Sequence, residues 1–118
     1  MSVETAKEKI LTALSGLDID SIDDSKLIRP EGNLLSFEGM AKEGFAIREY
    51  IFGLYVSKKI LDAKTNRIYP LLDSIDTKIE DEARKGPYGD EIRLKSIYPV
   101  GFDNGIIEYR CEIRVIEK

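Results

Sequence analysis

The stretch FAIREYIFGLYVSK, residues 45–58, is the most strongly patterned part of the sequence. Its even-numbered positions from 50 to 56 are all apolar, and Ile51, Gly53 and Tyr55 lie between them. Because successive side chains of a strand point to opposite faces, both faces are largely apolar through the middle of this segment. The pattern predicts a long central strand that is covered in part on both sides. Gly53 indicates a bulge or the close approach of a helix.

Two amphipathic helices are predicted on either side of that strand in the chain. In residues 1–17, apolar side chains recur at three- and four-residue steps, with Ser2 placed to cap the start and Gly16 to close the end. The same periodicity predicts a second helix at residues 66–85. Pro70 then falls in its first turn, where a proline is tolerated.

A C-terminal β-hairpin is predicted over residues 91–117. Apolar residues at odd positions from 107 to 115 alternate with charged residues, a pattern typical of a half-buried strand. The preceding strand is expected at 91–98, and 99–105 is expected to connect the two, with the turn at Asn104-Gly105.

The region between the first helix and the long strand has weaker signals. Residues 18–25 are acidic and rich in turn formers, which predicts a loop. Leu35 and Phe37 alternate with polar neighbours, which predicts a short strand at 33–38. The chain of 118 residues is therefore expected to form one α+β domain, with a mainly antiparallel sheet of four to five strands and two helices packed on one face.

The composition excludes several functional classes. The sequence has no histidine and a single cysteine, so it lacks a Ser-His-Asp triad, a Cys-His pair, an imidazole metal ligand and an intramolecular disulfide. Its net charge of −4 disfavours nucleic acid as a partner. Without an apolar leader or an apolar run long enough to span a bilayer, the chain is expected to be intracellular and away from membranes. These features predict a protein that is not an enzyme and that needs no cofactor or metal ion.

Three local motifs are better explained by structure than by chemistry. The acids at 18, 20, 23 and 24 do not form a calcium loop, because its fifth, sixth and twelfth positions hold Ile22, Asp23 and Arg29. Cys111 lies on the apolar face of the last strand, where a buried thiol is inert. Ser57 and Lys58 are adjacent in a strand, so they point to opposite faces and do not form a dyad.

Glu49 lies within the most apolar strand, and two roles are open for its carboxylate. A buried carboxylate has a raised pKa and can act in acid–base catalysis. Since buried charges are usually paired, we expect instead that Glu49 pairs with Arg48, Lys58 or an arginine of the last strand such as Arg114.

Three segments, residues 48–57, 69–80 and 96–115, together resemble the tail-terminator (tail-completion) proteins of long-tailed bacteriophages and prophages. The resemblance is one of element order, pattern and length, and it covers most of the chain except residues 17–44. It implies a ring, commonly of six subunits, that caps the tail tube, stops its growth and offers a surface to the head. It also implies contacts with tail-tube and head-connector proteins, a location in the host cytoplasm and then in the virion tail, and no catalytic residues.

Two regions are candidates for subunit or partner contacts. The mixed charges of Arg110, Glu112 and Arg114 can fix the register of a head-to-tail interface. The irregular segment 27–45 can reach a neighbour or be a simple connection, and its candidate contact residues are Arg29, Met40 and Phe45.

Other functions remain open from the sequence alone. The main alternative is a small intracellular protein- or ligand-binding domain without catalytic activity, which predicts a deep, largely apolar pocket. A carboxylate enzyme is a further alternative, and it requires at least two acids that converge in a cleft.

Overall fold

The computed structural model describes residues 1–21, 32–44, 47–59, 68–85 and 91–117. The chain has an α+β fold, as predicted, with a single five-stranded sheet in the order β1-β2-β3-β5-β4. The elements are α1 (Val3–Ala13), β1 (Asp20–Ser21), β2 (Gly32–Glu43), β3 (Ile47–Lys59), α2 (Ile68–Lys85), β4 (Ile92–Asp103) and β5 (Ile106–Glu117). All neighbouring strands are antiparallel except the two-residue β1, which runs parallel to β2.

The long strand is central, as its sequence predicts. β3 pairs with β2 on one side and with β5 on the other. The β3–β5 ladder runs from Arg48↔Glu117 to Lys59↔Ile106 without a register shift. The other two long ladders each contain at least one shift, so β3 and β5 form the regular centre of the sheet.

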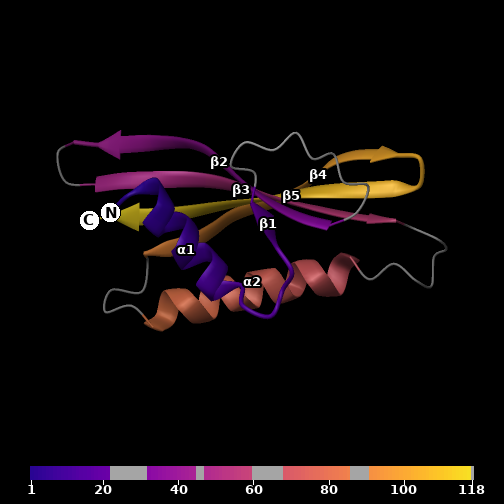
Figure 1. The fold of residues 1–118 in the computed structure, drawn as a ribbon, viewed down its shortest axis with the longest axis horizontal. Helices are drawn as coiled ribbons and strands as arrows, with labels where there is room; N and C mark the ends of the chain where they lie inside the picture. Colours follow the sequence, from indigo (N-terminus) through magenta and orange to yellow (C-terminus); the bar gives the residue numbers. More distant parts are fainter. Residues whose placement is uncertain (22–31, 45–46, 60–67, 86–90, 118) are drawn as a thin grey trace.

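Both helices cover the same face of the sheet. The side chains at positions 50, 52, 54 and 56 of β3 are buried in one cluster with apolar side chains of both helices, including Ile10 and Ile75. Figure 1 shows the arrangement of the two helices and the sheet. The apolar stripe of each helix therefore packs on that face. The opposite face of β3, which the sequence predicts to be partly covered as well, meets no helix among the described residues. Side chains of the neighbouring strands cover it instead.

Local signals at the helix ends and the last turn act as expected. The Ser2 hydroxyl accepts a hydrogen bond from the Thr5 amide at 3.1 Å and caps α1. The α-helix ends at Ala13, earlier than the predicted range 1–17, and Gly16 follows with φ of 95°. Asn104 and Gly105 have φ of 52° and 76°, positive at both positions as a two-residue hairpin turn of type I′ requires.

Two strands are longer than predicted because bulges carry them past glycine and proline. β2 continues from the predicted 33–38 segment to Glu43, through a register shift between Phe37 and Gly39. β4 continues past Pro99 to Asp103, through a shift between Pro99 and Gly101, so residues 99–103 are not a connection. β4 is an edge strand, where a proline that lacks an N–H is tolerated.

Two further predictions concern the segments that flank β2. Within the predicted loop at 18–25, Asp20 and Ser21 form the short strand β1, which pairs with Leu34 and Leu35, and residues 22–25 lie outside the described residues. The predicted contact residues Arg29 and Phe45 lie outside the described residues.

Candidate functional site

The sheet face opposite the helices carries a connected network of charged side chains. Strand alternation directs Arg110, Glu112 and Arg114 of β5 to this face, because Cys111 and Ile113 between them are buried under the helices. Glu38 of β2 and Glu49 of β3 complete the network. These five side chains are only 12–25% exposed, so they lie flat on the sheet.

The bulge in β2 brings Glu38 across the central strand. Its carboxylate accepts hydrogen bonds from the Tyr55 hydroxyl at 2.5 Å and from Arg110 Nη2. Gly53 makes room for this, since a Cβ added there would lie 2.7 Å from Glu38 Oε1. The sequence predicts a helix close to Gly53, but the close approach there is that of a strand carboxylate.

From Arg110 the network continues along β5. Arg110 Nη1 donates to Glu112 Oε1 at 3.2 Å and to the Tyr98 hydroxyl of β4 at 2.9 Å. Arg114 donates through Nε to Glu112 Oε2 at 3.0 Å and through Nη1 to Glu49 Oε2 at 2.7 Å. The sequence predicts that Glu49 pairs with Arg48, Lys58 or an arginine of the last strand, and the structure shows the pair with Arg114. The network thus joins all four long strands side by side.

The network changes the titration of its members. The bond to Glu38 raises the pKa of Arg110, and the bond to Glu49 raises the pKa of Arg114, in both cases against an opposing effect of burial. Burial alone would raise the pKa of Glu112, but its bonds to Arg114 and Arg110 outweigh it and hold that pKa below the ordinary value. Burial and the bond to Glu38 raise the pKa of Tyr55.

This arrangement is suited to holding strands together rather than to proton transfer. Each of its three carboxylates accepts a bond from an arginine. The Ser57 hydroxyl donates a hydrogen bond to the Glu108 carboxylate at 2.8 Å. Burial raises the pKa of Cys111 to about 12, which keeps the thiol protonated and unreactive near neutral pH.

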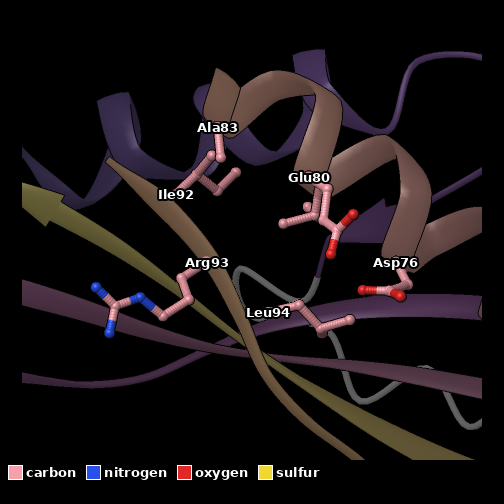
Figure 2. Close-up of a pocket in the computed structure, with 7 residues that line it drawn as sticks. Asp76, Glu80, Ala83, Ile92, Arg93 and Leu94 are labelled. Atoms are coloured by element: carbon pink, nitrogen blue, oxygen red, sulfur yellow. The ribbon is translucent and has the colours of Figure 1, made fainter. Parts of the chain in front are cut away.

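A small hollow lies between α2 and the first residues of β4 (Figure 2). Its volume is about 200 Å³, and its apolar walls come from Ile79, Ala83, Ile92 and Leu94. Asp76 and Glu80 of α2 lie at its acidic side, whereas Arg93 extends away from the helix toward the other side of β4 (Figure 2). This volume is below the 300–1,000 Å³ or so of ordinary small-molecule sites.

A second hollow, of about 390 Å³, lies on the charged face of the sheet. Its lining is mostly ionic: Glu43, Glu49, Arg93, Lys95 and Arg114, with Ile47 and Ile116. Arg93 and Arg114 are direct cross-strand neighbours of like charge. Arg114 is bound to two carboxylates, while no ion pair of Arg93 or Lys95 is seen among the described residues.

The edge strands carry most of the exposed large apolar side chains. Eight such residues are found in the described part of the chain, and five of them lie on β2 and β4. They are Phe37 and Met40 on β2, 42% and 45% exposed, and Tyr98, Val100 and Phe102 on β4, 42%, 42% and 67% exposed.

The predicted contact residues are thus divided between two places. Met40 is exposed on β2, as a contact residue needs to be. Arg110, Glu112 and Arg114 are largely covered, and both arginines bind Glu112 within the chain. The exposed apolar side chains of β4 are not found from the sequence, because residues 99–105 are predicted to be a connection. Extending the strand across Pro99 would have placed Val100 and Phe102 on an edge.

No family model and no curated protein matches the chain. Within the described ranges, no three potential metal ligands come together as a site. Neither described helix is long and apolar enough to cross a membrane.

Replacing Gly53 by alanine tests the packing of Glu38 on the sheet. The new Cβ must displace the carboxylate from Arg110 and Tyr55, so we expect Gly53→Ala to lower the free energy of unfolding by about 1–3 kcal/mol. In a Glu38→Ala background the same substitution should cost nothing or stabilise, because the space is then free. Urea unfolding of the four proteins in this cycle measures the coupling. Equal costs of Gly53→Ala in both backgrounds would contradict the packing.

The lowered pKa of Glu112 predicts an acid-sensitive contribution to stability. Its pKa lies below 4.5 in the folded chain and returns to about that value on unfolding. The contribution is therefore complete above about pH 4.5 and is lost as the pH falls through the folded value. Between about pH 5 and 3, Glu112→Gln should lose stability less steeply than the wild type. Asp73→Asn, which removes an exposed acid of α2 outside the network, should keep the wild-type slope.

Proposed function

We propose that this chain is a structural assembly protein of a phage-like tail, which forms a ring that terminates the tail tube and joins it to the head. The resemblance of three segments to tail terminators supports this reading. In the fold these segments are β3 (residues 48–57), α2 (69–80) and the β4–β5 hairpin (96–115). They make up most of the sheet and one of the helices.

The exposed apolar side chains on β2 and β4 are the observation that carries the proposal. The two strands lie toward opposite edges of one sheet, so their exposed apolar side chains belong to unlike surfaces that face away from each other. A head-to-tail interface between unlike surfaces of identical subunits is what closes a ring. Apolar side chains exposed in the single chain gain stability when a neighbour covers them.

The proposed ring is built from this chain alone, commonly as six copies, and contacts tail-tube and head-connector proteins at its two ends. It performs no reaction and needs no cofactor, nucleic acid or membrane. The protein works first in the cytoplasm of the host bacterium and then in the virion tail. The paired carboxylates of the charged face support a structural role, because each of them is already bound to an arginine.

The alternative is a small protein- or ligand-binding domain without catalytic activity. The hollow between α2 and β4 favours it, since apolar walls and two acids could hold a small cation. Its volume of about 200 Å³ is below that of ordinary small-molecule sites, and the larger hollow is ionic rather than apolar. The exposed apolar edges therefore give stronger support to self-association than the hollows give to a ligand.

Measuring the mass of the chain in solution tests the proposal. Size-exclusion chromatography with light scattering at increasing protein concentration should show a discrete oligomer that dissociates on dilution. Phe102→Asp should raise the dissociation constant about thirtyfold or more, because a charge in place of a central apolar contact costs about 2 kcal/mol or more.

Val3→Asp provides the matched control. Val3 is also exposed and apolar, but it is the first residue of α1, where an acid is tolerated, and it lies on neither edge strand. This variant should assemble as the wild type does. A wild-type chain that stays monomeric up to high micromolar concentration would contradict the proposed ring.

A further inference from the structure

We infer that the ionic hollow on the charged face of the sheet binds a small oxoanion of the phosphate type. The groups that hold it are Arg93 and Lys95 of β4 and the guanidinium of Arg114 on β5, all of which line the hollow. The inference goes beyond the proposed ring and does not depend on it. It concerns binding alone, without a reaction.

The hollow has the size and the net charge that such a ligand needs. Its volume of about 390 Å³ lies within the range of about 300–1,000 Å³ found for small-molecule sites. Three basic and two acidic side chains line it, so its net charge is positive. Arg93 and Lys95 are exposed, and a dissolved anion can therefore reach them.

The two arginines of the hollow are direct cross-strand neighbours. In the β4–β5 ladder, Arg93 is opposite Arg114. Figure 2 shows that Arg93 extends away from α2, toward the other side of β4. Like charges that face each other across two strands repel and destabilise a sheet. An anion between the two guanidinium groups replaces this repulsion by two attractions.

A bulge adds a third basic side chain to the pair. The ladder passes from Leu94↔Ile113 to Ser96↔Glu112, so Lys95 is the extra residue and has no partner on β5. Bulges of this kind redirect a side chain relative to the regular alternation of a strand. Lys95 lines the same hollow as Arg93, and the two together provide two positive charges for one ligand.

These basic groups have hydrogen-bond donors to spare. No ion pair of Arg93 or Lys95 occurs within the part of the chain that the structure describes. Arg114 donates through Nε and Nη1, and a guanidinium has further N–H groups on Nη2. Bonds from guanidinium groups to oxoanions are short and strong. An anion can thus bind here while Arg114 keeps both of its carboxylate partners.

The two acids of the hollow have different effects on an anion. Glu49 is bound to Arg114, so its charge is already balanced. Glu43 also lines the hollow, and its negative charge opposes the ligand. The account therefore predicts opposite effects of neutralising Arg93 and neutralising Glu43, which a purely structural role for these side chains would not produce.

Titration with inorganic phosphate tests the inference. At constant ionic strength, with chloride as the balancing ion, phosphate should raise the unfolding temperature of the wild type and give a saturable heat of binding in calorimetry. In NMR spectra, the side-chain Nε–H signals of Arg93 and Arg114 should shift along the same titration. Acetate should bind more weakly than phosphate, because it carries a single charge.

Single neutralising variants locate the site. Arg93→Gln and Lys95→Gln should each weaken phosphate binding about tenfold or more, because each removes a charge-assisted bond. Glu43→Gln should strengthen it about two- to fivefold. Without phosphate, Arg93→Gln should be at least as stable as the wild type, because the like-charge pair is gone. That result also shows that the variant is folded.

Arg84→Gln is the matched control. Arg84 is an exposed basic residue of α2 that does not line the hollow, and its removal changes the net charge by the same amount. This variant should bind phosphate as the wild type does.

Three results would overturn the inference. The first is that phosphate has no effect beyond that of chloride. The second is that Arg84→Gln weakens binding as much as Arg93→Gln, which indicates a general effect of charge. The third is that phosphate stabilises Arg93→Gln and Lys95→Gln as much as the wild type, which indicates exclusion of the salt from the protein surface. None of these results bears on the ring, which the mass of the chain in solution tests separately.

Discussion

The helices cover one face of the sheet, and the rest of the structure depends on that constraint. The covered face of β3 and β5 can be apolar throughout, with Phe52, Leu54 and Ile113 fully buried. The other face has no helix over it among the described residues, yet the middle of β3 carries few polar groups of its own. Charged side chains of β2 and β5 cover it by binding one another, and Gly53 leaves the space that Glu38 needs. The network therefore acts as the second cover of the sheet.

This constraint also determines where a partner can bind. On the charged face, the arginines and carboxylates of the network already bind each other, so a partner there would have to compete with internal ion pairs. The outer surface of α2 is strongly polar, with exposed acids such as Asp73, Asp76 and Asp81. Unlike those surfaces, β2 and β4 carry most of the exposed large apolar side chains of the described residues. The strands near the two edges of the sheet are therefore the surfaces that we propose for partner binding.

Much of the fold could be predicted from the sequence because periodicity reports burial. The 3.6-residue period of α2, the double apolar face of β3 and the Asn104-Gly105 turn each predicted the observed element. The lengths of β2 and β4 could not be predicted, because bulges let strands pass Gly39 and Pro99, which usually end them. The same error hid Val100 and Phe102. The sequence leaves several partners open for Glu49, because the choice depends on the register of β3 with β5. That register places Arg114 near Glu49.

Hydrogen–deuterium exchange of the wild-type chain, dilute and concentrated, tests the central claim most directly, because it reports which backbone becomes covered on assembly. The account predicts added protection in β2 at residues 36–43 and in β4 at 92–103, with no change in the already paired β3 and β5. Added protection confined to α2 or to the charged face, with the two edges unchanged, would contradict it.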